Sequence, residues 1–211
     1  MKYTFKQLHN ERINFLVINK NKDNVVINGN NNILLSAPHG VSQVRLGKPK
    51  HSEIGSLTTA LFLQKHTDSF LIAKTKNNCD DANFDEKSRY KENLINLIKQ
   101  HKIKYLIDIH GLAPNRECDI NLGTHLGKNT ISNVDLLDDL QQRLVDNNFI
   151  VSIDQPYMAG SHTLSGSINN QFNIWTLQIE INCSITNRKE NFDRYKVLLT
   201  ILTDWIKSIK P

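Results

Sequence analysis

Short runs of apolar residues alternate along the chain with longer stretches in which apolar residues recur at helical spacing. The runs Ile33–Leu35, Phe70–Ala73 and Tyr105–Ile109 are continuous and are flanked by polar segments, as expected of buried strands. Apolar residues follow helical spacing from Ser52 onward and again over Tyr90–Ile98. This alternation of strands and helices predicts a largely parallel sheet that is covered by helices on both faces.

The two ends of the chain extend this pattern. Two short β-like runs, Ile13–Ile18 and Val25–Ile27, precede the first buried strand. The later predicted elements are a helix with Leu136, Leu137, Leu140 and Leu144 inward, a strand over Phe149–Ile153, a loop containing Gly160 and Gly166, a strand over Thr176–Asn182, and a long helix from Phe192 to Ile209. No repeat, linker or composition break divides the chain, so we expect one domain over residues 1–211.

Composition narrows the class of protein. Hydrophobic residues make up 39% of the 211 residues and charged residues 22%, which is typical of globular proteins. The formal net charge of +5 arises from scattered basic residues, whereas nucleic-acid-binding proteins gather theirs on one face. Two segments are locally basic, Lys48-Pro49-Lys50 and Lys99–Lys104, and they read as a loop and an exposed helix. We therefore expect no nucleic-acid partner.

The cysteines and the N-terminal segment bear on the compartment. Cys79, Cys118 and Cys183 are odd in number and lie far apart, which favours neither a disulfide framework nor a cysteine zinc site. The segment Met1–Lys6 lacks the apolar core of a signal peptide, and no run reaches the ~18 apolar residues of a membrane helix. The sequence therefore predicts a cytoplasmic protein without a membrane partner, and it carries no signal for an oligomeric state.

Histidines follow or end two of the predicted strands. His39 lies just beyond Ile33–Leu35, and His110 ends the strand that contains Asp108 on the same side. Ligands of open α/β sheets bind outside the carboxyl ends of the strands, so both histidines are candidate metal ligands. Glu53, in the first turn of the next helix, is the best-placed third ligand, and Asp108 would orient the His110 ring. The alternatives are an ordinary loop histidine and a carboxylate that interacts with the helix dipole.

The segment Leu177–Asn182 carries apolar residues on one face and Gln178, Glu180 and Asn182 on the other. Burying that polar face without partners would be costly, so it either faces solvent on an edge strand or lines a site. In a site, Glu180 would suit a general base that acts on metal-bound water.

Several polar residues in the predicted loops could contact a substrate. Asp80, Asp81 and Asn83 could position a substrate or make Asx turns, and His162 lies in a loop at the same rim. Arg45 and Arg116 could bind a substrate carboxylate or be solvated, and Arg116 could also stabilise an oxyanion. His125 is a reserve candidate ligand.

The candidate residues fall into five motifs that occur in a defined order. These are Pro38-His39-Gly40, Glu53, Asp81-Ala82-Asn83, Asp108-Ile109-His110-Gly111 and Gln178-Ile179-Glu180-Ile181-Asn182. In this order they resemble the N-formylglutamate amidohydrolase family over roughly residues 33 to 183. More distantly, the arrangement is similar to the zinc carboxypeptidases and aspartoacylases. The resemblance implies a three-layer α/β/α sandwich with a mixed, mostly parallel sheet, a phosphorylase/hydrolase-like fold.

The same resemblance implies a zinc-dependent amidohydrolase that cleaves an amide bond in a small N-acyl amino acid or peptide-like substrate. His39, Glu53 and His110 would hold the zinc, and Glu180 would transfer the proton. The family tends to have an arginine directly after the Asp-x-Asn motif, whereas this chain has Phe84. The carboxylate of the substrate would then be bound by another arginine, and the candidates are Arg45, Arg89 and Arg116.

Two other functions compete with this hypothesis. The first is a non-catalytic protein that keeps the fold and binds a small ligand without metal. The second is a metal-free hydrolase with Ser36 or Ser161 as nucleophile, which is disfavoured because the sequence contains no Gly-x-Ser-x-Gly motif.

Overall fold

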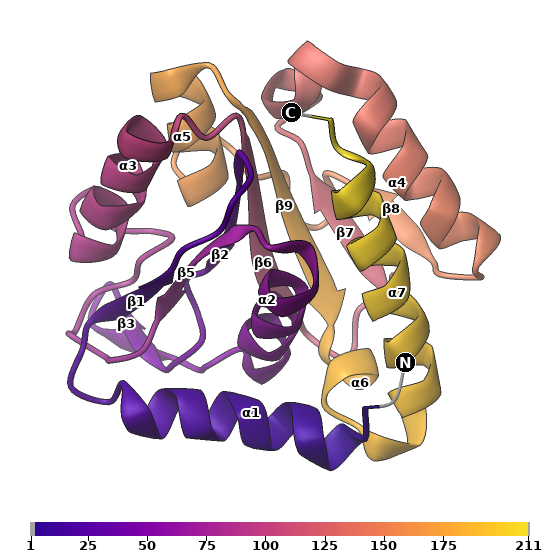
Figure 1. The fold of residues 1–211 in the computed structure, drawn as a ribbon, viewed down its shortest axis with the longest axis horizontal. Coiled ribbons are helices and arrows are strands. Elements are labelled where there is room, and N and C mark those ends of the chain that lie inside the picture. The colour runs from indigo at the N-terminus through magenta and orange to yellow at the C-terminus, as the bar shows by residue number, and fades with distance from the viewer. Residues whose placement is uncertain (1–2, 211) are drawn as a thin grey trace.

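The continuous apolar runs of the sequence form the centre of a seven-stranded sheet in the computed structural model, which describes residues 3–210 (Figure 1). The strands are β1 (Asn24–Ile27), β2 (Ile33–Ala37), β5 (Phe70–Lys74), β6 (Tyr105–Leu112), β7 (Ile120–Gly123), β8 (Val151–Ile153) and β9 (Trp175–Asn182). Their order in the sheet is β1-β5-β2-β6-β9-β7-β8. The pairs β1–β5 and β7–β9 are antiparallel and the others are parallel. The prediction of a mixed, mostly parallel sheet is confirmed.

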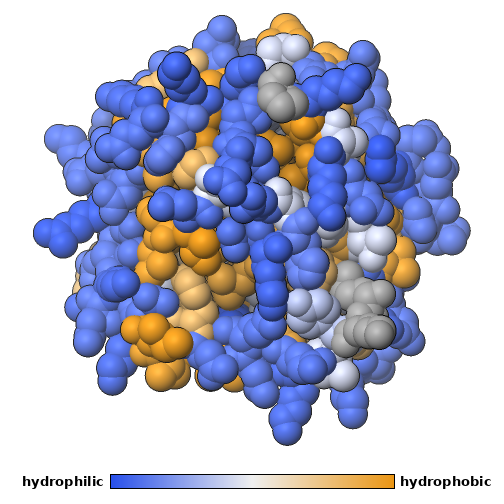
Figure 2. Space-filling model, in the orientation of Figure 1, coloured by the Kyte–Doolittle hydropathy of each residue, from blue (hydrophilic) through white to orange (hydrophobic). Residues whose placement is uncertain are grey.

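Helices cover both faces of this sheet. They are α1 (Phe5–Ile18), α2 (Ile54–Thr67), α3 (Arg89–His101), α4 (Val134–Asp146), α5 (Leu164–Phe172), α6 (Cys183–Thr186) and α7 (Phe192–Ser208), with 3₁₀ turns at Lys128–Asn133 and Lys189–Asn191. Buried residues of α2, α4 and α7 form one core with the sheet, and those of α3 and α5 form a second core on the opposite face. The outer surfaces are mostly hydrophilic in the view of Figure 2. The fold is therefore the expected three-layer α/β/α sandwich.

The first element differs from its prediction. The run Ile13–Ile18 is the second half of helix α1 and is not a strand. The helix begins with a capping box, in which the Thr4 side chain accepts a hydrogen bond from the Gln7 backbone and the Gln7 side chain accepts one from the Thr4 backbone. Leu8 is the one fully buried side chain of α1, so the helix shows little of the apolar periodicity by which helices are recognised in sequences.

The predicted polar loop between β2 and α2 contains a small hairpin of strands β3 (Gln43–Arg45) and β4 (Lys48–Lys50). Its two-residue turn, Leu46 and Gly47, has positive φ at both positions, which is the conformation of a type I′ hairpin turn. The locally basic Lys48–Lys50 segment is thus a strand. The hairpin holds Arg45 and Lys50 above the carboxyl end of β2.

The predicted loop around Gly160 and Gly166 contains helix α5, which places Gly166 inside a helix. A Cβ atom at Gly166 would lie 2.2 Å from the Gly160 carbonyl oxygen, so the absence of a side chain permits this close approach. Thr163 caps the helix by accepting a hydrogen bond from the Gly166 backbone. The packing of α5 brings the preceding loop, residues 156–163, over the carboxyl ends of the central strands.

The central strands β2 and β6 lie where the strand order reverses. From β2 the chain passes through α2 to β5 on one side, and it then returns through α3 to β6 on the other side. The carboxyl ends of such a pair form the usual ligand-binding crevice of open α/β sheets. Within residues 3–210, no helix has the length and apolar character needed to cross a membrane.

Candidate metal centre and substrate pocket

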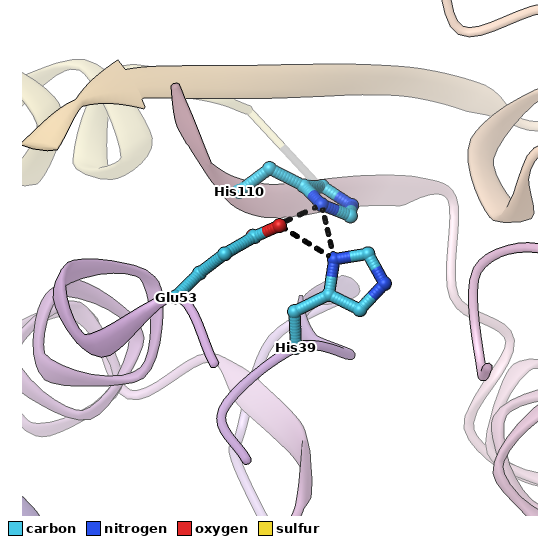
Figure 3. Close-up of side chains that lie close together, drawn as sticks. All are labelled: His39, Glu53 and His110. Carbon is cyan, nitrogen blue, oxygen red and sulfur yellow. Dashed lines mark hydrogen bonds and ion pairs between the residues drawn. The ribbon is translucent and has the colours of Figure 1, made fainter. Parts of the chain in front are cut away.

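His39, Glu53 and His110 converge at this crevice from three different elements (Figure 3). His39 follows β2, Glu53 is the N-cap residue of α2, and His110 lies in β6. The Glu53 backbone N–H donates to the His39 carbonyl oxygen at 2.9 Å, which fixes the start of α2 against the His39 loop. All three side chains are at least nine-tenths buried. The predicted cluster therefore exists in the structure.

The facing atoms of these three side chains are spaced as ligands of one ion would be. His39 Nδ1 lies 2.8 Å from Glu53 Oε1 and 3.1 Å from His110 Nδ1, and His110 Nδ1 lies 3.4 Å from Glu53 Oε2. Two ligand atoms bound to a tetrahedral zinc ion lie about 3.3 Å apart. The spacing of these three side chains is therefore compatible with their holding one metal ion.

The outer nitrogen of each imidazole is held by a buried aspartate. His39 Nε2 lies 2.9 Å from Asp81 Oδ1, and His110 Nε2 lies 3.1 Å from Asp108 Oδ2. A carboxylate only accepts hydrogen bonds, so each Nε2 carries a hydrogen, and a metal ion at the centre of the cluster would bind the lone pairs of the two Nδ1 atoms. The two Nδ1 atoms face each other and the Glu53 carboxylate, as ligand atoms around a shared cation would. The donor set and its tautomers therefore fit a metal ion.

The two aspartates are themselves anchored. Asp81 Oδ2 accepts a hydrogen bond from Arg45 Nε at 2.7 Å, and Asp108 Oδ2 accepts one from Ser165 Oγ at 3.3 Å. Burial raises the pKa of Asp81, but the hydrogen bond and charge of His39, followed by those of Arg45, outweigh it and lower this pKa. Asp81 thus contacts His39 and lies outside the pocket lining.

The Glu53 carboxylate accepts hydrogen bonds from two further donors. The Gly111 backbone N–H donates to Oε2 at 2.8 Å, and the Lys50 ammonium group donates to Oε1 at 2.6 Å. Burial alone would raise the pKa of Glu53, but the charges and hydrogen bonds of His39 and His110 hold it well below its usual range. Burial lowers the pKa of His110, yet Asp108 and Glu53 raise it well above the ordinary value.

Glu180 lies beside His110, because the two residues are partners in the register of β9 and β6. Strand β9 is flanked by β6 and β7, so the alternative of an exposed edge strand is wrong and the polar face of β9 lines the site. Gln178 Nε2 donates to Glu180 Oε1 at 2.9 Å. Burial, assisted by the charge of Glu53, raises the pKa of Glu180 to about 8, and the charge of His110 opposes this shift.

These groups open into a pocket of ≈ 390 Å³. Of the residues predicted to bind substrate, Arg45, Asn83 and His162 line it. The Arg45 guanidinium also lies over the ring of Phe84, 5.2 Å from its centroid, so Phe84 packs against a neighbouring arginine. The other lining residues are Lys50, Gly111, Pro156, Tyr157, Met158, Ala159, Gly160, Thr163 and Gln178, together with the three candidate ligands and Glu180.

The remaining predicted residues lie outside this lining. Arg89 is an exposed residue at the start of α3, and Arg116 is exposed with its guanidinium 6.0 Å from the centroid of the Tyr157 ring. His125 belongs to the turn after β7, where its backbone N–H donates to the Met158 carbonyl oxygen. Lys50 lines the site although the sequence analysis assigned it no role. Gln178, on the polar face of β9 that was expected to face solvent or line a site, lines it.

Comparison with known proteins finds solved structures of similar fold but does not assign the chain to a family. No protein family model matches the sequence, and no curated protein sequence matches it. A gene product of Agrobacterium tumefaciens superposes with a TM-score of 0.67 at 15% identity, covering 94% of this chain and 99% of that chain. N-formylglutamate amidohydrolase from Ralstonia eutropha gives 0.57 at 13% identity, covering 88% and 96%. A metallo-carboxypeptidase from Burkholderia cenocepacia gives 0.54 at 11% identity, covering 94% and 67%. The likeness at these identities concerns the fold alone.

Proposed function

We propose that this protein is a zinc-dependent amidohydrolase that cleaves an amide bond in a small N-acyl amino acid or peptide-like substrate. One observation carries the proposal: two imidazoles, each fixed by an outer aspartate, turn their Nδ1 atoms towards a shared glutamate at the floor of a pocket. The fold supports it, because solved structures of similar fold include an N-formylglutamate amidohydrolase and a metallo-carboxypeptidase.

In this proposal His39, Glu53 and His110 hold the zinc. When bound there, zinc would polarise the substrate carbonyl and lower the pKa of a coordinated water molecule. Asp81 and Asp108 keep the two imidazoles in the required tautomer, and the Gly111 backbone N–H orients Glu53.

Glu180 is the proton-transferring group of the proposed reaction. Its carboxylate takes a proton from the attacking water while the new C–O bond forms, and it returns the proton to the amide nitrogen as the C–N bond breaks. The raised pKa of about 8 lies close enough to neutrality for both transfers. Gln178 Nε2 holds the carboxylate in place through its hydrogen bond to Oε1.

In this proposal, the Arg45 guanidinium binds the carboxylate of the substrate. It lines the pocket, and its Nε atom is engaged by Asp81, which leaves the terminal nitrogens to contact a ligand. Asn83 and His162 supply further polar groups to the pocket lining. Arg89 and Arg116 are exposed outside the lining, and the proposal does not use them.

Metal content by mass spectrometry tests this function, on untagged protein purified without chelator. We expect about one zinc ion per chain in the wild type and none in the His39→Ala and His110→Ala variants. His101→Ala removes an exposed histidine at the end of α3 and should keep the metal. A positive result leads to a screen of N-acyl amino acids. If the wild type binds no zinc even when zinc is offered, the non-catalytic ligand-binding function replaces this one.

A further inference from the structure

A second cavity of ≈ 350 Å³ adjoins the pocket described above. Helices α3 and α5, which lie near each other in Figure 1, form its walls together with the segments around Phe84 and His162. Phe84 and His162 line both cavities, so the two spaces share a boundary. The other residues that line the second cavity are Glu86, Lys91, Ile95, Ser161, Ser167, Ile168 and Gln171.

Lys91 is the unusual member of this lining. The residue is only 8% exposed, yet its ammonium group forms no hydrogen bond or ion pair with any residue from 3 to 210; its backbone N–H alone is engaged, by Ser88 Oγ. Buried lysines in proteins are ordinarily paired, because removing an ammonium group from water without a partner is costly.

The position of Lys91 in its helix adds to this cost. It is the third residue of α3, in the first turn, where the helix dipole disfavours a cation. Burial lowers the pKa of Lys91, and the charges of Asp85, Asp108, Asp81 and Glu86 only partly oppose that shift. Lys91 therefore presents the second cavity with an unpaired cation, at the end of a helix whose dipole favours an anion.

We infer that the second cavity is a carboxylate subsite, in which Lys91 binds the distal carboxylate of a substrate longer than a single N-acyl amino acid. This inference rests on the proposed function and specifies its substrate class. The hydroxyls of Ser161 and Ser167 and the amide of Gln171 supply further polar groups, and Ile95 and Ile168 contact the connecting carbon chain. Glu86, an exposed carboxylate on the same lining, favours a singly charged carboxylate over a dense anion such as phosphate.

The test compares N-acetyl dipeptides that have a free C-terminal carboxylate with the same dipeptides as C-terminal amides. We expect the wild type to favour the free acid at least about tenfold in kcat/KM, mainly through KM, because a hydrogen bond to a charged group contributes that much. Lys91→Met should abolish the preference and leave the hydrolysis of short N-acetyl amino acids unchanged. Lys91→Arg should restore part of the preference. Lys87→Met removes an exposed lysine four residues earlier and should behave as the wild type.

The outcomes separate this inference from the function on which it rests. If short substrates are hydrolysed but the wild type shows no preference, or Lys91→Met retains it, the subsite is refuted and the hydrolase stands. If no substrate is hydrolysed, calorimetric titration compares the binding of glutarate to the wild type and to Lys91→Met, which tests the subsite without hydrolysis. Binding at least about tenfold weaker in Lys91→Met supports the subsite, and equal binding overturns it. The thermal midpoint of Lys91→Met should not fall, because the substitution removes an unpaired buried charge.

Discussion

Replacing Asp81 by asparagine tests the claim that the outer aspartates set the tautomers of the metal ligands. Asp81 is fully buried, and its carboxylate lies 2.9 Å from His39 Nε2 and 2.7 Å from Arg45 Nε. Asparagine keeps the shape but removes the charge, and its amide can donate to Nε2 and so move the ring hydrogen to Nδ1, where the metal binds. Losing such a partner typically weakens metal binding 10- to 100-fold, or about 1.4–2.7 kcal/mol.

The structure also predicts an order of effects. Asp108→Asn removes a longer contact, 3.1 Å to His110 Nε2, and frees no arginine, so its effect should be smaller than that of Asp81→Asn. Zinc affinity is measured by competition with a chromogenic chelator at fixed pH. Asp138→Asn, on the exposed face of α4, is the matched control and should bind zinc as the wild type does. Wild-type affinity in both active-site variants would refute the tautomer argument.

Three further expectations follow from individual contacts. Gln178→Met should lower kcat for an amide substrate about tenfold, because it removes the hydrogen bond that holds the Glu180 carboxylate. An unchanged kcat would contradict this role. Gly166→Ala should lower the free energy of unfolding in urea by about 1–3 kcal/mol, because its Cβ would lie 2.2 Å from the Gly160 carbonyl oxygen. An unchanged midpoint of urea unfolding would show that α5 can shift. Iodoacetamide at pH 8 should alkylate the exposed Cys79 well before Cys183. Burial raises the pKa of the Cys183 thiol to about 11, which leaves only ~0.1% of it as thiolate at pH 8. Peptide mapping of a time course measures the order of alkylation, and the reverse order would contradict the prediction.

The central sheet could be predicted because its strands are buried on both faces. Ile33–Ala37 and Phe70–Lys74 are apolar almost throughout, and every residue of each is buried. Their polar neighbours at the carboxyl ends were therefore visible as candidate ligands, and His39 and His110 do meet there. The alternation in β9 likewise indicated Glu180.

The elements that were missed have short or weak apolar patterns in the sequence. Helix α1 depends on a capping box, and the β3–β4 hairpin depends on positive φ at Leu46 and Gly47. Helix α5 is short and rich in polar residues, with a glycine that tertiary packing requires. Lys50 and Lys91 could not be assigned from sequence either, because a lysine in a polar segment ordinarily lies in solvent.

The charges of the side chains around the site also bear on whether a metal ion binds there. Four acidic side chains gather at the crevice within a largely buried space: Glu53, Asp81, Asp108 and Glu180. Two basic side chains contact them, Lys50 on Glu53 and Arg45 on Asp81. With Glu180 mostly protonated at neutral pH and both imidazoles neutral, the ionised Glu53, Asp81 and Asp108 leave one negative charge without a fixed basic partner among these contacts, and buried charges are costly unless compensated. One divalent cation supplies that compensation at the point where the Nδ1 lone pairs of His39 and His110 converge. The charge balance is thus consistent with the ion that the ligand spacing supports.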